Sequence, residues 1–212
     1  MRVFTIVGLA LLLVLAGCLG RSPEVAHYLL GGQLLGGQLL GDQLREGQEA
    51  GGAAAGTLAP EETTGPAILV GPVRLPAYLD RPQLARLERG GRLELDEYAR
   101  WVGGFEENFL RAVAHDLARR TGSIRIAVAP SKAPFPFDAQ VRLHVDDLVA
   151  VDGTTLRVRI RWAIHRFESD APAELFVMDE SRPLADDDDE TLVAAHEEVL
   201  RDLAGRIEAA IR

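Results

Sequence analysis

Strict alternation of apolar and polar residues marks the clearest element of the chain. At 141–146 and again at 156–165 every second residue is apolar, and most residues between them are arginine, histidine or aspartate. A period of two is typical of β-strands that bury one face. The pair Asp152-Gly153 between the two runs is a strong turn signal, so the pattern predicts a hairpin.

The register of this hairpin predicts an irregularity. A two-residue turn places Asp146 opposite Arg159 on the solvated face, where the opposite charges make a favourable cross-strand pair. The same register turns Asp147 toward the core. We therefore expect a β-bulge near Asp146-Asp147.

Two segments show helical spacing instead. In 105–121 and from about 190 to 211, apolar residues recur every three or four positions and form one stripe. Two glutamates lie in the first turn of the first segment and two arginines in its last turn, which suits the helix dipole, and Gly122 follows as a stop signal. The aspartates at 186–189 precede the second segment and can cap its free N–H groups.

Shorter apolar stretches complete the fold. Residues 67–71 read as a strand, and Pro72 after them indicates an edge position or an early strand end. Residues 83–87 and 92–96 read as a hairpin across a Gly-Gly pair, and two more strands are expected at 124–128 and 175–178. The expected fold class is α+β, with a single, largely antiparallel sheet and two helices packed on one face.

The chain begins like a secreted lipoprotein. One positive residue, Arg2, precedes an apolar run at 6–16, as in a signal peptide. Leu15-Ala16-Gly17-Cys18 resembles a bacterial lipobox, which implies lipid attachment, including acyl chains such as palmitate, at Cys18. A transmembrane anchor fits less well, because 3–19 is short and contains two glycines. A buried core cysteine fits less well too, because it does not explain the small residues at 16 and 17.

Three parts follow from this reading. Residues 1–17 are the predicted lipoprotein signal peptide, 18–66 the lipidated N-terminus with a low-complexity linker, and 67–212 the folded domain. Four pentads, LLGGQ, LLGGQ, LLGDQ and LREGQ, fill 29–48. A period of five suits neither helix nor strand, and paired glycines disfavour both, so we interpret the repeat as a flexible insertion. The alternative is a short segment that binds a partner or touches a membrane.

Charge and cysteine content narrow the class of protein. The net charge is −9, and residues 169–212 account for all of it, with four basic and thirteen acidic side chains. A nucleic-acid-binding protein needs a basic surface, so we expect no nucleic acid among the partners. Cys18 is the only cysteine, so packing alone must hold the fold.

No recognisable catalytic or metal-binding motif occurs. The acidic run at 186–190 lacks the alternating ligands and central glycine of an EF-hand loop and is better read as a helix cap. The five histidines form no zinc-binding pair at helical spacing. His115 beside Asp116 could support acid–base chemistry, but it falls next to the apolar stripe of its helix. We therefore expect no enzyme, no cofactor and no metal.

Two strings of residues resemble a known family. Val70-Gly71-Pro72-Val73 and Tyr78-Leu79-Asp80-Arg81-Pro82-Gln83-Leu84 are similar to the signature of the ABC-type transport auxiliary lipoproteins, the group of the paraquat-inducible lipoprotein C. Supporting fragments are Ala99-Arg100-Trp101, Glu107-Asn108-Phe109, Arg161-Trp162 and Leu192-Val193-Ala194-Ala195-His196. The resemblance covers 67–212, the lipobox and an early Tyr28-Leu29-Leu30. The pentads separate this triplet from the body, which leaves open whether it joins the sheet.

The resemblance implies a non-enzymatic envelope lipoprotein. Such a protein is anchored to the membrane by its N-terminal lipid and works with an MCE-domain protein and an ABC transporter in the traffic of lipids or other hydrophobic compounds. Leu19 follows the cysteine in place of the aspartate that favours inner-membrane retention, so we expect the outer membrane, facing the periplasm. The alternative is a stand-alone periplasmic lipoprotein that binds a lipid or another small ligand in an apolar pocket.

The Pro-rich loop at 73–83 is the predicted partner surface. Tyr78 and Arg81 in this loop, together with Trp101, are residue types common at interface hot spots, and prolines lower the entropy lost on docking. The partner is either a neighbouring copy of the chain or an MCE-type protein. The alternative is that Tyr78 covers the edge of the hairpin and the prolines shape a crossover.

Overall fold

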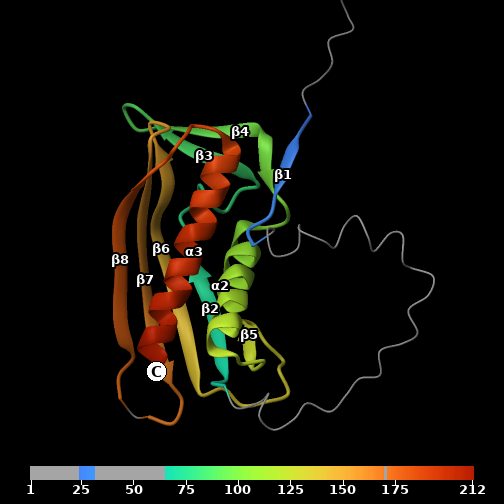
Figure 1. Cartoon of the computed structure of the whole chain (residues 1–212), viewed down its shortest axis with the longest axis vertical. Helices are drawn as coiled ribbons and strands as arrows, with labels where there is room; N and C mark the ends of the chain where they lie inside the picture. Colours follow the sequence, from blue (N-terminus) through green and yellow to red (C-terminus); the bar gives the residue numbers. More distant parts are fainter. Residues whose placement is uncertain (1–23, 32–64, 170) are drawn as a thin grey trace, which may run out of the picture.

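A computed structural model describes residues 24–31, 65–169 and 171–212 (Figure 1). The predicted signal peptide, Cys18 and all but the first three residues of the pentads lie outside these ranges. The described residues form eight strands, β1 (Ala26–Tyr28), β2 (Ile68–Arg74), β3 (Gln83–Glu88), β4 (Arg92–Trp101), β5 (Ile126–Val128), β6 (Ala139–Val151), β7 (Thr155–Arg166) and β8 (Glu174–Pro183). They also form two helices, α2 (Phe105–Thr121) and α3 (Asp189–Ile211).

The strands make one mixed sheet. Its order is β1-β4-β3-β6-β2-β5, in which β2 pairs with the first part of β6 and β3 with its last residues. β7 pairs with β6 along its opposite edge, and β8 pairs with β7. Four pairs are parallel, β1 with β4, β2 with β5, β2 with β6 and β3 with β6. The pairs β3 with β4, β6 with β7 and β7 with β8 are antiparallel. The expectation of a largely antiparallel sheet was therefore wrong, because long crossovers return the chain to parallel positions that no local pattern reveals.

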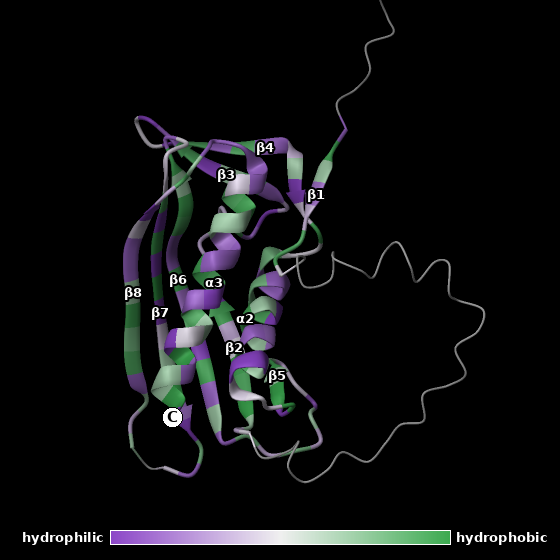
Figure 2. Ribbon diagram, viewed as in Figure 1, coloured by the Kyte–Doolittle hydropathy of each residue, from purple (hydrophilic) through white to green (hydrophobic). Residues whose placement is uncertain are grey.

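Both helices lie on one face of this sheet, as predicted (Figure 1). α2 packs on β2 and β5, and α3 packs on β6 and β7. The apolar stripes face inward, so that Phe109, Leu117 and Leu203 are fully buried. Figure 2 shows hydrophobic and hydrophilic residues alternating along the strands. The apolar members of this alternation, such as Val158 and Ile160, are buried in the core. No helix of the described residues packs on the opposite face of the sheet.

The helix boundaries follow from local chemistry. α2 covers 105–121 as predicted, and Gly122 after it takes the left-handed conformation with a φ of 65°. The acidic run before α3 acts as the expected cap, since the side chain of Asp188 accepts a 2.6 Å hydrogen bond from the N–H of Thr191. This hydrogen bond lowers the pKa of Asp188.

The β6–β7 hairpin contains the predicted bulge. The register shifts between Val145 and Asp147, so that Asp147 pairs with Arg159 and Asp146 is the extra residue. The turn contains three residues, 152–154, in place of the expected two. The carboxylate of Asp146 accepts hydrogen bonds of 2.7 and 2.6 Å from Arg161, which lower its pKa. The bulge also lets Asp147 reach Arg157 at 3.0 Å, and neither carboxylate enters the core.

Pro72 does not mark an edge. β2 lies between β5 and β6, and it continues through Pro72 to Arg74. The register against β6 shifts between Val70 and Val73, so a bulge accommodates the missing N–H. The freed carbonyl of Gly71 accepts a 2.9 Å hydrogen bond from the buried side chain of Gln140.

The segment before the pentads belongs to the folded body. β1 pairs in parallel with the end of β4, with Tyr28 opposite Trp101. Tyr28 packs against the core, and Leu30 is only 2% exposed. The early Tyr-Leu-Leu triplet therefore joins the sheet and core across the pentad insertion. The predicted linker at 18–66 thus contains a short segment that packs on the body.

Candidate functional site

The structure separates the residues predicted to meet a partner. Arg81 is exposed, whereas Tyr78 is half-buried and its hydroxyl accepts a 3.1 Å hydrogen bond from the N–H of Leu148. Burial raises the pKa of Tyr78. The Tyr78 hydroxyl thus joins the loop to β6.

Trp101 is not a surface residue. It is 4% exposed, and its ring makes edge contacts with Phe105 and His196 at centroid distances of 5.1 and 5.6 Å. A partner cannot reach this ring, so the hypothesis that Trp101 binds one needs correction. The tryptophan instead supports the end of β4 against both helices.

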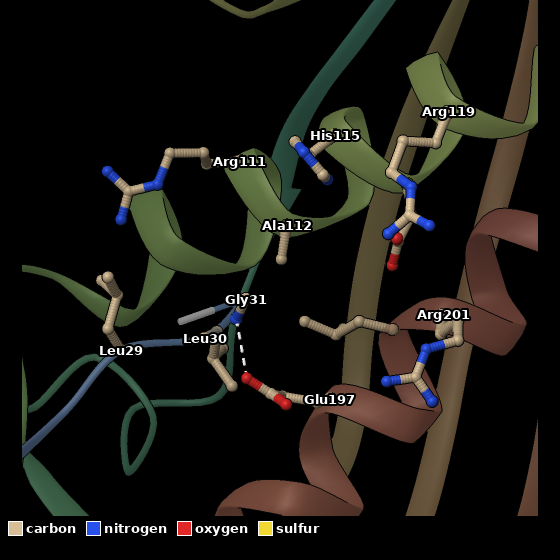
Figure 3. A pocket seen from close by; sticks show the side chains of 11 residues that line it. Leu29, Leu30, Gly31, Arg111, Ala112, His115, Arg119, Glu197 and Arg201 are labelled. Carbon is tan, nitrogen blue, oxygen red and sulfur yellow. Dashed lines mark hydrogen bonds between the residues drawn. The ribbon is translucent and has the colours of Figure 1, made fainter. Parts of the chain in front are cut away.

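A pocket of about 360 Å³ opens between α2, α3 and the segment that follows β1 (Figure 3). The residues that line it come from three distant parts of the sequence. They are Leu29, Leu30, Gly31, Arg111, Ala112, His115, Asp116, Arg119, Glu197, Leu200 and Arg201. Its volume lies in the lower part of the range that small-molecule sites span.

The N-terminal segment forms one wall of the pocket. The N–H of Gly31 donates a 3.0 Å hydrogen bond to Oε1 of Glu197 on α3. Gly31 has a φ of +78° and an added Cβ would lie 3.8 Å from Ala112, so conformation rather than space favours glycine here. Two turns earlier on α3, Glu190 accepts a 3.4 Å hydrogen bond from the Tyr28 hydroxyl. Burial and the nearby carboxylates raise the pKa of Tyr28 to about 12, which keeps this donor protonated.

The floor of the pocket is apolar. Leu30, Ala112 and Leu200 are 2%, 8% and 1% exposed, and each comes from a different wall. Leu29 is half-buried at the side of the opening. An alkyl group entering the pocket would therefore meet aliphatic side chains on all three sides.

The rim of the pocket is basic. Arg119 on α2 and Arg201 on α3 are exposed, and no carboxylate oxygen of the described residues lies within 4.0 Å of either guanidinium. Arg111 donates a 2.5 Å hydrogen bond to the side chain of Asn108 and lies 3.9 Å from Glu107. In Figure 3 the guanidinium groups of Arg119 and Arg201 lie beside the opening, Arg111 is directed away from them, and the carboxylate of Glu197 is turned to Gly31.

The polar side chains that line the pocket are arginines, carboxylates and one histidine. No serine, threonine or cysteine is among its lining residues, so a nucleophile for acyl transfer is missing from it. His115 lines the pocket, a position that its place beside the apolar stripe of α2 did not reveal. Within residues 24–31, 65–169 and 171–212, no group of three or more potential ligands could hold a metal ion.

Sequence reasoning could not find this pocket, because it assigned 29–31 to the linker. The signal available was the Tyr-Leu-Leu triplet, whose likeness to the family implied a strand. The repeat concealed that signal, because the same two leucines open each of the first three pentads.

A second, shallower hollow lies on the helix-free face of the sheet. It measures about 490 Å³ and lies between β2, β6, β7 and the edge strand β8, with Arg74, Arg142 and Arg161 around it. Leu175 and Val177 on β8 are 80% and 54% exposed. The arginines of β7 on this face are largely neutralised, since Arg161 pairs with Asp146 and Arg159 with Asp179.

Neither helix in the part of the chain that the structure describes is long and apolar enough to cross a membrane.

Comparison with known proteins identifies the chain's relatives. The family model described as "ABC-type transport auxiliary lipoprotein component" matches residues 51–208. The crystal structure of an uncharacterized protein superposes with a TM-score of 0.59 at 11% identity, covering 68% of this chain and 92% of that one. That of a Xanthomonas campestris protein of family DUF330 superposes with a TM-score of 0.52 at 15% identity, covering 68% of this chain and 84% of that one. No curated protein is significantly similar in sequence.

Proposed function

The chain belongs to the ABC-type transport auxiliary lipoprotein family, and we propose that it is a non-enzymatic component of an intermembrane transport system for lipids or other hydrophobic compounds. Its partners in this proposal are an MCE-domain protein and the components of an ABC transporter. The family match over residues 51–208 is the observation that carries the proposal.

The proposed anchor is a lipid on Cys18. Two acyl chains already anchor a protein stably, and each buried CH₂ contributes about 0.8 kcal/mol. Leu19 after the cysteine favours the outer membrane, with the folded body in the periplasm. Cys18→Ser should leave an unlipidated and uncut precursor. Metabolic labelling with a clickable fatty acid tests this, and equal label on the variant would refute the anchor.

Because β1 is part of the folded body, the tether, meaning the stretch of chain between Cys18 and the body, is short. If the body began at residue 67, the chain from Cys18 would have a contour length of about 160–175 Å. β1 begins at Ala26 and is paired with β4, so only eight Cα steps separate it from the proposed lipid. Those steps span at most about 26–29 Å, which keeps the β1 end of the body close to the membrane. A component that works at a fixed distance from its membrane needs such a short tether.

Isolation of the chain from its native membranes tests the transport role. We expect an MCE-domain protein to co-purify after mild crosslinking, and we expect the complex to fractionate with outer-membrane markers. Fractionation with inner-membrane markers would refute the choice of membrane. A lipoprotein that is labelled at Cys18 but isolated without transport components would refute the partnership.

The pocket supports a second candidate function. A stand-alone lipoprotein that binds a small ligand needs an apolar cavity of several hundred Å³, and the pocket between α2 and α3 has about 360 Å³. The two candidates differ in where the chain acts. A carrier binds its ligand without the transport complex, whereas an auxiliary component remains bound to that complex.

A further inference from the structure

We infer that the pocket between α2, α3 and residues 29–31 binds a single-chain anionic amphiphile, with the alkyl chain on the floor and the anionic head at Arg119 and Arg201. The inference rests on the second candidate function and gives it a class of ligand. That class is an alkyl chain ending in a carboxylate or a phosphate.

The floor selects for an alkyl chain. Leu30, Ala112 and Leu200 form its base from three sides and are already buried, and the half-buried Leu29 at the opening offers apolar surface that an alkyl chain would cover. Covering exposed apolar surface stabilises a complex by about 25 cal/mol for each Å² removed from water. A cavity of about 360 Å³ suits one chain better than the two chains of a phospholipid.

The rim selects for an anionic head. Arg119 and Arg201 approach the opening from two different helices, and no described carboxylate lies within 4.0 Å of them. Their charges are therefore available to a ligand, and a guanidinium can bind a carboxylate or phosphate with two parallel hydrogen bonds. A cationic head at the same place would meet both guanidinium groups and lose affinity.

The acidic residues of the pocket do not cancel this preference. The carboxylate of Glu197 accepts the 3.0 Å hydrogen bond from the N–H of Gly31, so it is engaged in holding the N-terminal wall. Asp116 is the other carboxylate among the lining residues, against three arginines. The residues around the opening thus carry a net positive charge although the chain as a whole carries −9.

Photolabelling of the full-length lipoprotein in its own membranes tests the inference. The probe is a dodecanoic acid that bears a diazirine on its chain, and cross-linked peptides are mapped by mass spectrometry. We expect adducts on the three walls of the pocket. The variant Arg119→Gln with Arg201→Gln should reduce these adducts about tenfold, because it removes two charged hydrogen-bond donors. Both side chains are exposed, so the variant should melt like the parent chain.

Two matched controls test whether labelling depends on the arginines of the rim and on the negative charge of the probe. Arg206→Gln removes an exposed arginine of α3 that pairs with Glu180 and does not line the pocket, so labelling should stay unchanged. A trimethylammonium probe of the same chain length should not label the pocket. Equal labelling by this cationic probe, or unchanged labelling of the double variant, would overturn the inference.

A further arm tests the source of the anionic head. Excess dodecyl phosphate should displace the carboxylate probe, whereas excess inorganic phosphate should not. Displacement by inorganic phosphate would show that the rim binds free anions without a chain and would overturn the inference. Co-purification with transport components is measured independently of the pocket, so failure of the labelling leaves that result standing.

Discussion

The N–H of Gly31 donates a 3.0 Å hydrogen bond to Oε1 of Glu197, and so joins two residues that are 166 positions apart. This bond ties the segment after β1 to the last helix. The core contact of Leu30 and the pairing of Tyr28 with Trp101 lie just before it in the chain. The N-terminal segment is therefore held at three points within 28–31, which makes it part of the folded body.

Leu30→Ala should destabilise the protein. Leu30 is 2% exposed, and truncation of a buried leucine costs about 2–5 kcal/mol of unfolding free energy. For a domain of this size that loss corresponds to a fall in the melting temperature of about 5–15 °C. Circular dichroism melting measures it. Leu35→Ala, the matched position of the second pentad, should leave the melting temperature within about 2 °C, and an equal fall in both variants would contradict a specific role for the first pentad.

Local patterns in the sequence predicted most of the elements. The alternation at 141–146 and 156–165 and the stripe at 105–121 depend only on near neighbours, so the hairpin, its bulge and α2 could all be located. Strand direction could not be predicted in the same way. β2 is parallel to both of its neighbours because the chain returns to it through long connections, and no residue within β2 reports their path.

His196 should make the protein less stable in acid. Burial lowers its pKa from 6.5 to about 4, although the ring bonds the carbonyl of Leu192 at 2.8 Å. Between pH 6.5 and 4 the unfolded chain therefore binds a proton that the folded chain does not, so stability falls as the pH falls through this window. The loss is on the order of 3 kcal/mol by pH 4. His196→Phe should flatten this part of the pH profile of thermal melting, and an unchanged profile would contradict the assignment.

The candidate site was harder to predict than the fold. Its walls come from 29–31, α2 and α3, and only the tertiary structure brings these segments together. The sequence did single out His115, but it could not place this residue in a pocket without the opposite wall. It also proposed Trp101 for a surface, because residue type alone does not report burial.

A variant of Tyr78 should change the stability of the protein, whereas a variant of Arg81 should change partner binding alone. Tyr78→Phe removes the acceptor of the 3.1 Å hydrogen bond from Leu148 and should cost about 1 kcal/mol of unfolding free energy. Arg81→Ala changes an exposed residue and should not alter melting. We expect Arg81→Ala to reduce crosslinking to a partner or a second copy in membranes. Crosslinking at the parent level would place the interface elsewhere.

The last prediction concerns the length of the tether. A flexible linker of twenty Gly and Ser residues inserted between Arg21 and Ser22 extends the path from Cys18 to Ala26 from eight residues to about 28. Because effective concentration falls roughly as the −3/2 power of tether length, crosslinking to a membrane-bound partner should fall roughly sixfold. The same linker between Gly51 and Gly52 lies beyond β1 and should have no effect.

Comparing the two insertions shows whether the chain from Cys18 first joins the folded body at β1 or at residue 67. If the body were held only from residue 67, both insertions would lengthen the same path, from 49 residues to about 69, and both would reduce crosslinking by less than about twofold. Equal effects would therefore contradict anchoring through β1. A large effect of the first insertion alone requires that 26–31 remain attached to the body, since that attachment isolates 32–64 from the path to the membrane.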